Sequence, residues 1–192
     1  MLKFFLIILT LLLGSLFPLK TATAQEKNSA VLVNPVRGKD FWNYKYSLIE
    51  TPRAQYGIIK SHGLPATWLI RYDALTDQEV QSFIKSLDAS QEIGIFFEIT
   101  PGITRDAGVS YNQSENWHLA KSVLLTGYSP EDRIRLIDTA FKKFSEITGK
   151  TPKSVGAWWI DAYSLGYMKD KYGIEANLDV ADQYTTDGYQ VW

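Results

Sequence analysis

The sequence predicts an α/β fold built on a parallel β-sheet, because apolar strand-like runs alternate with amphipathic helices. The predicted strands are rich in β-branched and aromatic residues and span residues 30–36, 65–70, 92–99, 154–160 and 174–180. They are apolar over almost their whole length, which is typical of parallel strands that helices cover on both sides.

Four helices are predicted in the intervals between these strands. Their starts carry recognisable signals: residues 76–79 (TDQE) have the form of a capping box, and Pro130 follows Ser129 at a first helical turn. Three of the four are followed by a glycine, which marks their ends: Gly63, Gly149 and Gly173. The predicted helices span residues 53–61, 76–87, 130–148 and 164–172.

Two parallel architectures fit this order, a (β/α) barrel and an open doubly wound sheet. No G-x-G-x-x-G or G-x-x-x-x-G-K motif follows a strand, which disfavours a nucleotide-binding open sheet. A complete barrel takes about 250 residues, and the chain has 192. We therefore expect a barrel that is incomplete or truncated at its C-terminus.

Composition and charge restrict the function classes. The chain is 45% hydrophobic and 21% charged, which is typical of a globular protein rather than a disordered one. Its net charge of −1 argues against a nucleic-acid partner, which normally meets a basic face. Because the chain has no cysteine, thiol nucleophiles, disulfides and cysteine-ligated metals are excluded.

Residues 1–24 have the features of a signal peptide. Lys3 precedes an apolar run over residues 4–17, and Ala22-Thr23-Ala24 has the form of a cleavage site. A retained anchor is the alternative, although a membrane-spanning helix needs about 20 apolar residues. We expect export to the periplasm or the extracellular space, no stable membrane insertion after cleavage, and one domain over residues 25–192.

Two carboxylates lie where ligands of parallel α/β folds bind, at the carboxyl ends of strands. Glu98 ends an apolar strand, where partial burial would favour the protonated form that a general acid needs. Asp161 follows the fourth strand and could complete a glycosidase pair. Alternatively, Glu98 pairs with Arg37 or Arg71, and Asp161 caps the next helix.

Other residues near the strand ends are candidates for substrate binding. Trp158 and Trp159 are predicted to lie on the fourth strand with their rings on opposite faces, one in the core and one free to stack on a sugar. Residues 100–128 are predicted to form a long polar lid or binding loop, with a disordered insertion as the alternative. The candidate binding residues are Asn34, Arg37, Asp73, Trp117, His118, Trp158 and Trp159.

No metal or other cofactor is predicted. The two histidines, His62 and His118, form no H-x-x-x-H or H-E-x-x-H pair, and His62 lies at a predicted helix end. No G-x-S-x-G elbow is present, so an α/β-hydrolase triad has no support either.

Several segments, taken in order, resemble the polysaccharide deacetylase-like (NodB-type) division of the glycoside hydrolase/deacetylase barrel superfamily. Residues 59–68 (IKSHGLPATW) are similar to its k-x-G-x-p-A-T-f-F segment, and residues 91–94 (QEIG) to its h-E-i-G segment. Residues 148–152 (TGKTP) and 165–173 (LGYMKDKYG) are similar to its later helix-and-strand pattern. The resemblance implies a (β/α)7-type barrel, carbohydrate substrates and an extracytoplasmic location.

The metal-binding motifs of that family are missing from this chain. The place of its Asp-Asp pair reads Val33-Asn34-Pro35-Val36, and its H-x-x-x-H would fall on Phe96 and Thr100. Its arginine motif after the fourth strand reads Gly156-Ala157-Trp158-Trp159. Phenylalanine cannot ligate zinc and asparagine is a poor base, so the fold alone does not imply metal-dependent deacetylation.

Three functions stay open. The first is a secreted, metal-independent hydrolase of polysaccharides or oligosaccharides that uses Glu98 and Asp161 as a glycoside hydrolase would. The second is an inactive carbohydrate-binding module whose contacts include Trp159, Trp117 and Arg37. The third is a structural protein of the cell envelope, for which the sequence has no positive feature. The first is the function we expect from the sequence.

Overall fold

The computed structural model describes residues 30–41, 47–113 and 119–179, so the predicted signal peptide lies outside the described residues. In the described part of the chain, no helix combines the length and the apolar character needed to cross a membrane.

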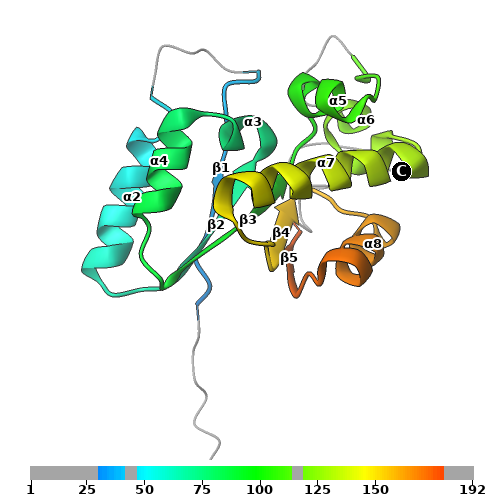
Figure 1. Cartoon of the computed structure of the whole chain (residues 1–192). Helices are drawn as coiled ribbons and strands as arrows, with labels where there is room; N and C mark the ends of the chain where they lie inside the picture. The colour runs from blue at the N-terminus through cyan, green and yellow to red at the C-terminus, as the bar shows by residue number, and fades with distance from the viewer. Residues whose placement is uncertain (1–29, 42–46, 114–118, 180–192) are drawn as a thin grey trace, which may run out of the picture. The chain divides into compact units, whose positions relative to one another are not determined.

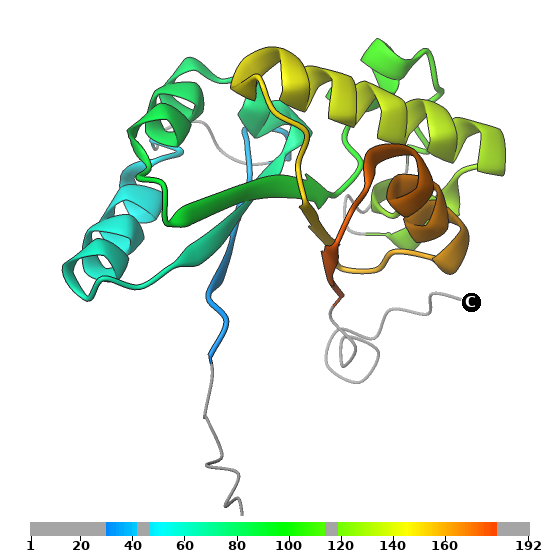
Figure 2. The same ribbon diagram turned by 60° about the horizontal axis from the view of Figure 1, so that its bottom comes forward.

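Within the described residues, five parallel strands form one sheet whose spatial order is the same as their order along the chain (Figures 1 and 2). They are β1 (Val33–Val36), β2 (Ala66–Arg71), β3 (Gln91–Phe97), β4 (Ser154–Ala157) and β5 (Ala176–Leu178). A doubly wound sheet reverses its order at a switch point, and this sheet does not. The predicted α/β class is confirmed, and the architecture is a half-barrel.

Helices fill the crossovers between these strands. They are α2 (Glu50–Ser61), α3 (Tyr72–Leu75), α4 (Gln78–Ser86), α5 (Pro101–Ala107), α6 (Ala120–Val123), the 3-10 helix η1 (Leu125–Gly127), α7 (Pro130–Thr148) and α8 (Ala162–Tyr172). Right-handed crossovers between strands in consecutive order place the connecting helices on one face of the sheet. Figure 1 shows the long helix α7 crossing in front of β3 and β4.

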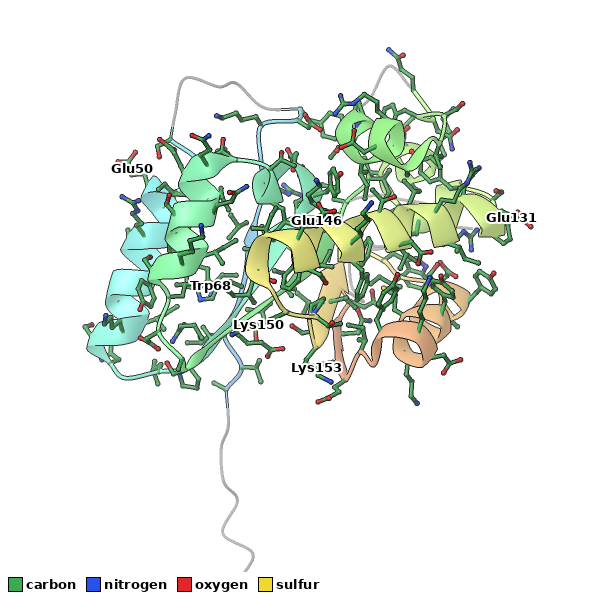
Figure 3. The ribbon with its side chains drawn as sticks, viewed as in Figure 1. Glu50, Trp68, Glu131, Glu146, Lys150 and Lys153 are labelled. Carbon is green, nitrogen blue, oxygen red and sulfur yellow. The ribbon has the colours of Figure 1, made fainter. Side chains whose placement is uncertain are left out.

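The core lies between this helix-covered face and the helices. Val36, Ile70, Ile95 and Val155 are neighbours in register across β1 to β4, so their side chains leave the sheet on the same side. All four belong to the buried cluster that the helices cover. Trp68 is buried among them, edge-on to Phe83 of α4 with ring centroids 5.2 Å apart (Figure 3).

The helix ends follow the signals in the sequence, with one shift. The Asp77 side chain, rather than that of Thr76, caps α4 by accepting from the amides of Glu79 and Val80. Ser129 caps α7 as predicted, by accepting from the Asp132 amide. Gly149, at the end of α7, has φ +69°, a left-handed conformation that favours glycine.

Two predicted elements are wrong. The segment over residues 100–128 is not a structureless loop, because α5, α6 and η1 lie within it and bury Ile103, Val123 and Leu125 in the core. The fourth strand ends at Ala157, so Trp158 and Trp159 follow the strand instead of alternating along it. Both errors have the same origin, because short elements carry too few residues to show a hydrophobic period.

On the opposite face of the sheet, one large side chain lies over two glycines. Leu69 of β2 is 1% exposed. A Cβ built on Gly156 of β4 would lie 2.4 Å from Leu69 Cδ1, and one on Gly94 of β3 would lie 2.7 Å from Leu69 Cδ2. The two glycines therefore make the room that Leu69 occupies, beneath the strand ends where the candidate site lies.

Candidate functional site

Charged and aromatic side chains from four adjacent strands meet at the carboxyl end of the half-barrel. Arg37 directly follows β1, Arg71 is the last residue of β2, Glu98 directly follows β3 and Trp158 directly follows β4. Asp73 of α3 joins them. We name these residues (Arg37, Arg71, Asp73, Glu98 and Trp158) the Glu98 cluster. It occupies the position that ligand sites take in parallel α/β folds.

The Glu98 carboxylate accepts hydrogen bonds on both of its oxygens. Arg37 Nη2 donates to Oε1 over 2.8 Å and Trp158 Nε1 donates to the same oxygen over 3.0 Å. Arg71 Nη1 donates to Oε2. The Glu98 side chain is only 1% exposed. The ion-pair alternative for Glu98 is therefore the arrangement that the structure has, with both arginines as partners.

Arg71 is the centre of the cluster, with a side chain that is 0% exposed. Its Nε and Nη2 donate to the two oxygens of Asp73 over 2.7 and 2.8 Å, a bidentate pair. Nη2 also donates to the Asp40 carbonyl over 2.9 Å. Burial opposes the charge of the guanidinium, but Asp73 and Glu98 outweigh it and raise the pKa of Arg71 above its ordinary value.

Aromatic rings form the edge of the cluster. The Arg37 guanidinium lies 4.8 Å from the centroid of the Trp158 ring, close enough for a cation–π interaction. Phe41 lies 5.8 Å from the Arg71 guanidinium and 6.3 Å from the Tyr111 ring. Burial, together with the charges of Glu98 and Asp40, raises the pKa of Tyr111. Arg37, Phe41, Tyr111 and Trp158 are half-buried, so they form the accessible rim of the cluster.

Phe41 holds this position with a strained backbone. Its φ of +74° is in the left-handed region that residues with a Cβ rarely adopt. Such strain persists where surrounding contacts determine the conformation, and it is commonest at ligand sites. The contacts of Phe41 with Arg71 and Tyr111 connect the strained residue to the Glu98 cluster.

Asp161 has a different set of partners. It is the N-cap of α8, accepting from the Ser164 amide over 2.9 Å and the Ser164 hydroxyl over 2.7 Å. It also pairs with Arg133 of α7 over 3.2 Å. Neither partner belongs to the Glu98 cluster. The helix-cap alternative describes the contacts of Asp161, and its catalytic pairing with Glu98 stays a prediction.

The structure brings together some of the predicted binding residues and separates others. Arg37, Asp73 and Trp158 are in the Glu98 cluster, and Trp159 follows Trp158 as a half-buried residue. Asn34 is in register with Trp68, so its side chain leaves the sheet on the helix-covered face instead. Trp117 and His118 lie outside the described residues. No group of three metal-ligating side chains occurs within residues 30–41, 47–113 and 119–179.

Sequence reasoning gave too little weight to Arg71 and left Phe41 and Tyr111 out of the candidate binding residues. Arg71 has the same signal as Glu98, a charged residue that ends an apolar run at a strand end. Phe41 and Tyr111 have no such signal, because a positive φ at a phenylalanine and a contact over 70 positions of sequence are properties of the folded chain.

No protein-family model matches the chain, and no curated protein does. Among solved structures it is similar to a family 4 carbohydrate esterase from Streptomyces lividans, at TM-score 0.46 and 14% identity over 78% of this chain and 62% of that one. A family 4 pseudoenzyme from Bacillus anthracis has TM-score 0.45 and 14% identity, over 79% of this chain and 44% of that one.

A peptidoglycan deacetylase from Bacillus subtilis is similar at TM-score 0.43 and 15% identity, over 77% of this chain and 58% of that one. The chain therefore spans between 44% and 62% of the length of these three structures.

Proposed function

We propose that this domain binds a polysaccharide at the Glu98 cluster and does not cleave it. The observation that carries the proposal is the saturation of Glu98. A general acid needs a carboxyl group with a transferable proton within reach of the substrate. The Glu98 oxygens instead accept from Arg37, Trp158 and Arg71, and the side chain is almost fully buried.

The rim of the cluster supports the binding part of the proposal. Trp158, Phe41 and Tyr111 are half-buried aromatic side chains at the carboxyl ends of the strands. Aromatic rings give sugars an apolar face to pack on, and the side chain of Arg37, 27% exposed, has N–H donors for hydroxyl groups. The carbohydrate class itself comes from the resemblance in the sequence and is part of the proposal.

Calorimetric titration of the purified protein with oligosaccharides tests binding, while released sugar and acetate are followed with and without EDTA. We expect binding without release of either product. Trp158→Ala should weaken binding about tenfold, which corresponds to the loss of one good aromatic contact. Tyr163→Ala is the matched control, because Tyr163 lies on α8 and is 51% exposed; it should bind as the parent does.

Two results would contradict the proposal in different ways. Sugar release that persists in EDTA and is lost in Glu98→Gln would identify a metal-independent glycoside hydrolase, the function first expected from the sequence. Acetate release that EDTA abolishes would identify a metal-dependent deacetylase.

We also propose that the protein is exported and that residues 1–24 are removed. The charged Lys3, the apolar run and the Ala22-Thr23-Ala24 motif support this. Mass spectrometry of the protein secreted by a bacterial host tests it. A chain that begins at Gln25 is the expected result, whereas an intact N-terminus in the membrane fraction would identify a retained anchor.

A further inference from the structure

The segment after β1 is held against the Glu98 cluster by the backbone of one residue, Asp40. The Asp40 amide donates to Asp73 Oδ2 over 2.8 Å, and the Asp40 carbonyl accepts from Arg71 Nη2 over 2.9 Å. The Gly38 carbonyl accepts from the same Arg71 nitrogen over 3.3 Å. Side chains that lie 31 and 33 positions later in the sequence therefore bind both backbone polar groups of Asp40.

Gly38 allows the segment to come this close to Asp73. A Cβ atom built on Gly38 would lie 2.4 Å from Asp73 Cγ and 2.5 Å from the Ala74 nitrogen, closer than a side chain can come. The Asp73 carboxylate has a full set of donors. Its Oδ1 accepts from Arg71 Nε over 2.7 Å and from the Ala74 amide over 3.0 Å, and its Oδ2 accepts from Arg71 Nη2 and the Asp40 amide. Asp73 therefore holds Arg71 and the Asp40 backbone in one fixed arrangement.

Phe41, the residue with the strained backbone, directly follows Asp40. Its φ of +74° describes a rotation away from the peptide group between Asp40 and Phe41, whose carbonyl accepts from Arg71. A phenylalanine keeps a left-handed conformation where surrounding contacts determine it, and the hydrogen bonds on Asp40 are contacts of this kind. The half-buried Phe41 ring lies 5.8 Å from the Arg71 guanidinium and 6.3 Å from the Tyr111 ring. The held backbone thus places this ring at the rim of the cluster.

We propose that Asp73 is a positioning residue of the glycan site, which acts through Arg71 and the Asp40 backbone to hold the Phe41 ring where a sugar packs on it. This proposal rests on the proposed function and specifies how its binding surface is preorganised. A ring that is fixed before the ligand arrives gives higher affinity, because binding then does not have to order it. The side chain of Asp73 is only 9% exposed, so its effect on the glycan is indirect.

A double-mutant cycle on the full protein tests whether Asp73 acts through Phe41. β-1,4-linked oligosaccharides of N-acetylglucosamine, glucosamine and glucose are titrated by calorimetry, and the one that the parent binds most tightly is used for the variants. Phe41→Ala removes the ring, and Asp73→Asn replaces an accepting oxygen with an NH₂ group that cannot accept. Each should weaken binding about tenfold, as the loss of one good aromatic contact does. The double variant should bind no more weakly than Phe41→Ala, because no ring is left to position.

Gly38→Ala tests the same contact without changing Asp73 or Phe41. Its methyl group would push the segment away from Asp73, so binding should weaken about tenfold in the parent and remain unchanged in the Phe41→Ala background. Gly57→Ala is the matched control, because Gly57 lies in α2 and a Cβ there would meet nothing within 4 Å; it should bind as the parent does. Circular dichroism checks that each variant folds, and the Gly38→Ala cycle decides the question if Asp73→Asn does not fold.

Hydrogen exchange in the free protein provides a readout that does not depend on the ligand. The Asp40 amide should exchange at least about tenfold faster in Asp73→Asn than in the parent, since it loses its acceptor. Unchanged exchange, or losses of affinity that simply add in the double variant, would overturn the positioning role and leave glycan binding intact. No binding of any of the three oligosaccharides by the parent would overturn both proposals.

Discussion

At the scale of single residues, the site consists of buried charges, and each of them needs an oppositely charged partner. Arg71 is fully buried and is compensated by Asp73 on one side and Glu98 on the other. Removing one partner from such a group costs more than the pair contributes, because a buried charge then lacks compensation. The stability of the domain therefore depends on the Glu98 cluster, which is also the proposed binding surface.

Glu98→Gln tests this dependence. It keeps the shape of the side chain but removes the negative charge, while Asp73 continues to hold Arg71. We expect the free energy of unfolding to fall by about 2–3 kcal/mol, the range for a lost hydrogen bond to a charged group. Urea unfolding followed by tryptophan fluorescence measures it.

Glu92→Gln is the control for this substitution, on the same strand β3 but at an exposed position. Its effect should stay within about 0.5 kcal/mol, as for most surface substitutions. A Glu98→Gln protein as stable as the Glu92→Gln protein would show that the arginines do not depend on Glu98.

Substitutions at Asp161 separate its two possible roles, a helix cap and a catalytic group. If its role is to cap α8, Asp161→Ala should lower the free energy of unfolding by about 1 kcal/mol, and Asp161→Ser should restore most of that loss, because serine is also a good N-cap residue. Thermal unfolding of the two variants gives the comparison. Sugar release by the parent that neither variant retains would instead support a catalytic role.

At the scale of elements, the tight contact between β2 and β4 predicts that even Gly156→Ala lowers the stability of the protein. The Cβ of Gly156→Ala would lie 2.4 Å from Leu69 Cδ1. Since Leu69 is enclosed, either its side chain or the strands have to shift, and overpacking of this kind costs about 1–3 kcal/mol. Chemical denaturation of Gly156→Ala, Leu69→Ala and the double variant measures the coupling. The double variant should be more stable than additivity predicts, and simple additivity would refute the contact.

The elements that the sequence predicted share strong local signals. Helix α7 has Ser129 and Pro130 at its start and Gly149 at its end, and all three function as predicted. The short helices α5 and α6 were missed because seven and four residues show too little of a helical period. Their buried residues Ile103 and Val123 are scattered through a polar segment, so only tertiary packing identifies them as core.

The sequence predicted where the candidate site lies better than it predicted which residues form it. The rule that ligands bind at the carboxyl ends of parallel strands selected Arg37, Asp73, Glu98 and Trp158, which do come together. It also selected Asn34, because the rule does not say which face of the sheet a side chain takes. That depends on register, which a single sequence does not contain.

At the scale of the whole molecule, β1 and β5 are the outermost strands of the sheet among the described residues. The Thr67 amide donates to the Leu32 carbonyl, so in a parallel ladder residues 32, 34 and 36 face β2 and Pro35 faces the open edge. Proline has no N–H group and therefore cannot donate to another strand there. Pro35 therefore removes one of the donors with which another chain could pair along β1.

The pH dependence of unfolding tests the ionic contacts of the whole domain. Burial alone would raise the pKa of Asp138 of α7, but hydrogen bonds from Tyr172, Lys171 and Tyr167 of α8 outweigh it and lower that pKa. Lys39 and two backbone amides likewise outweigh burial and lower the pKa of Asp77. In the unfolded chain both carboxyl groups regain ordinary pKa values near 3.9.

The sign of the effect follows from these directions. Below about pH 4 the unfolded chain binds protons that the folded protein does not, so stability falls as the pH decreases. We expect urea midpoints that are level between about pH 7 and 5 and fall at lower pH. Asp138→Asn should start from a lower midpoint, because it loses the charge that joins α7 to α8, and should decline less steeply. A parallel decline in the parent and in Asp138→Asn would mean that the α7–α8 contact does not contribute to acid sensitivity.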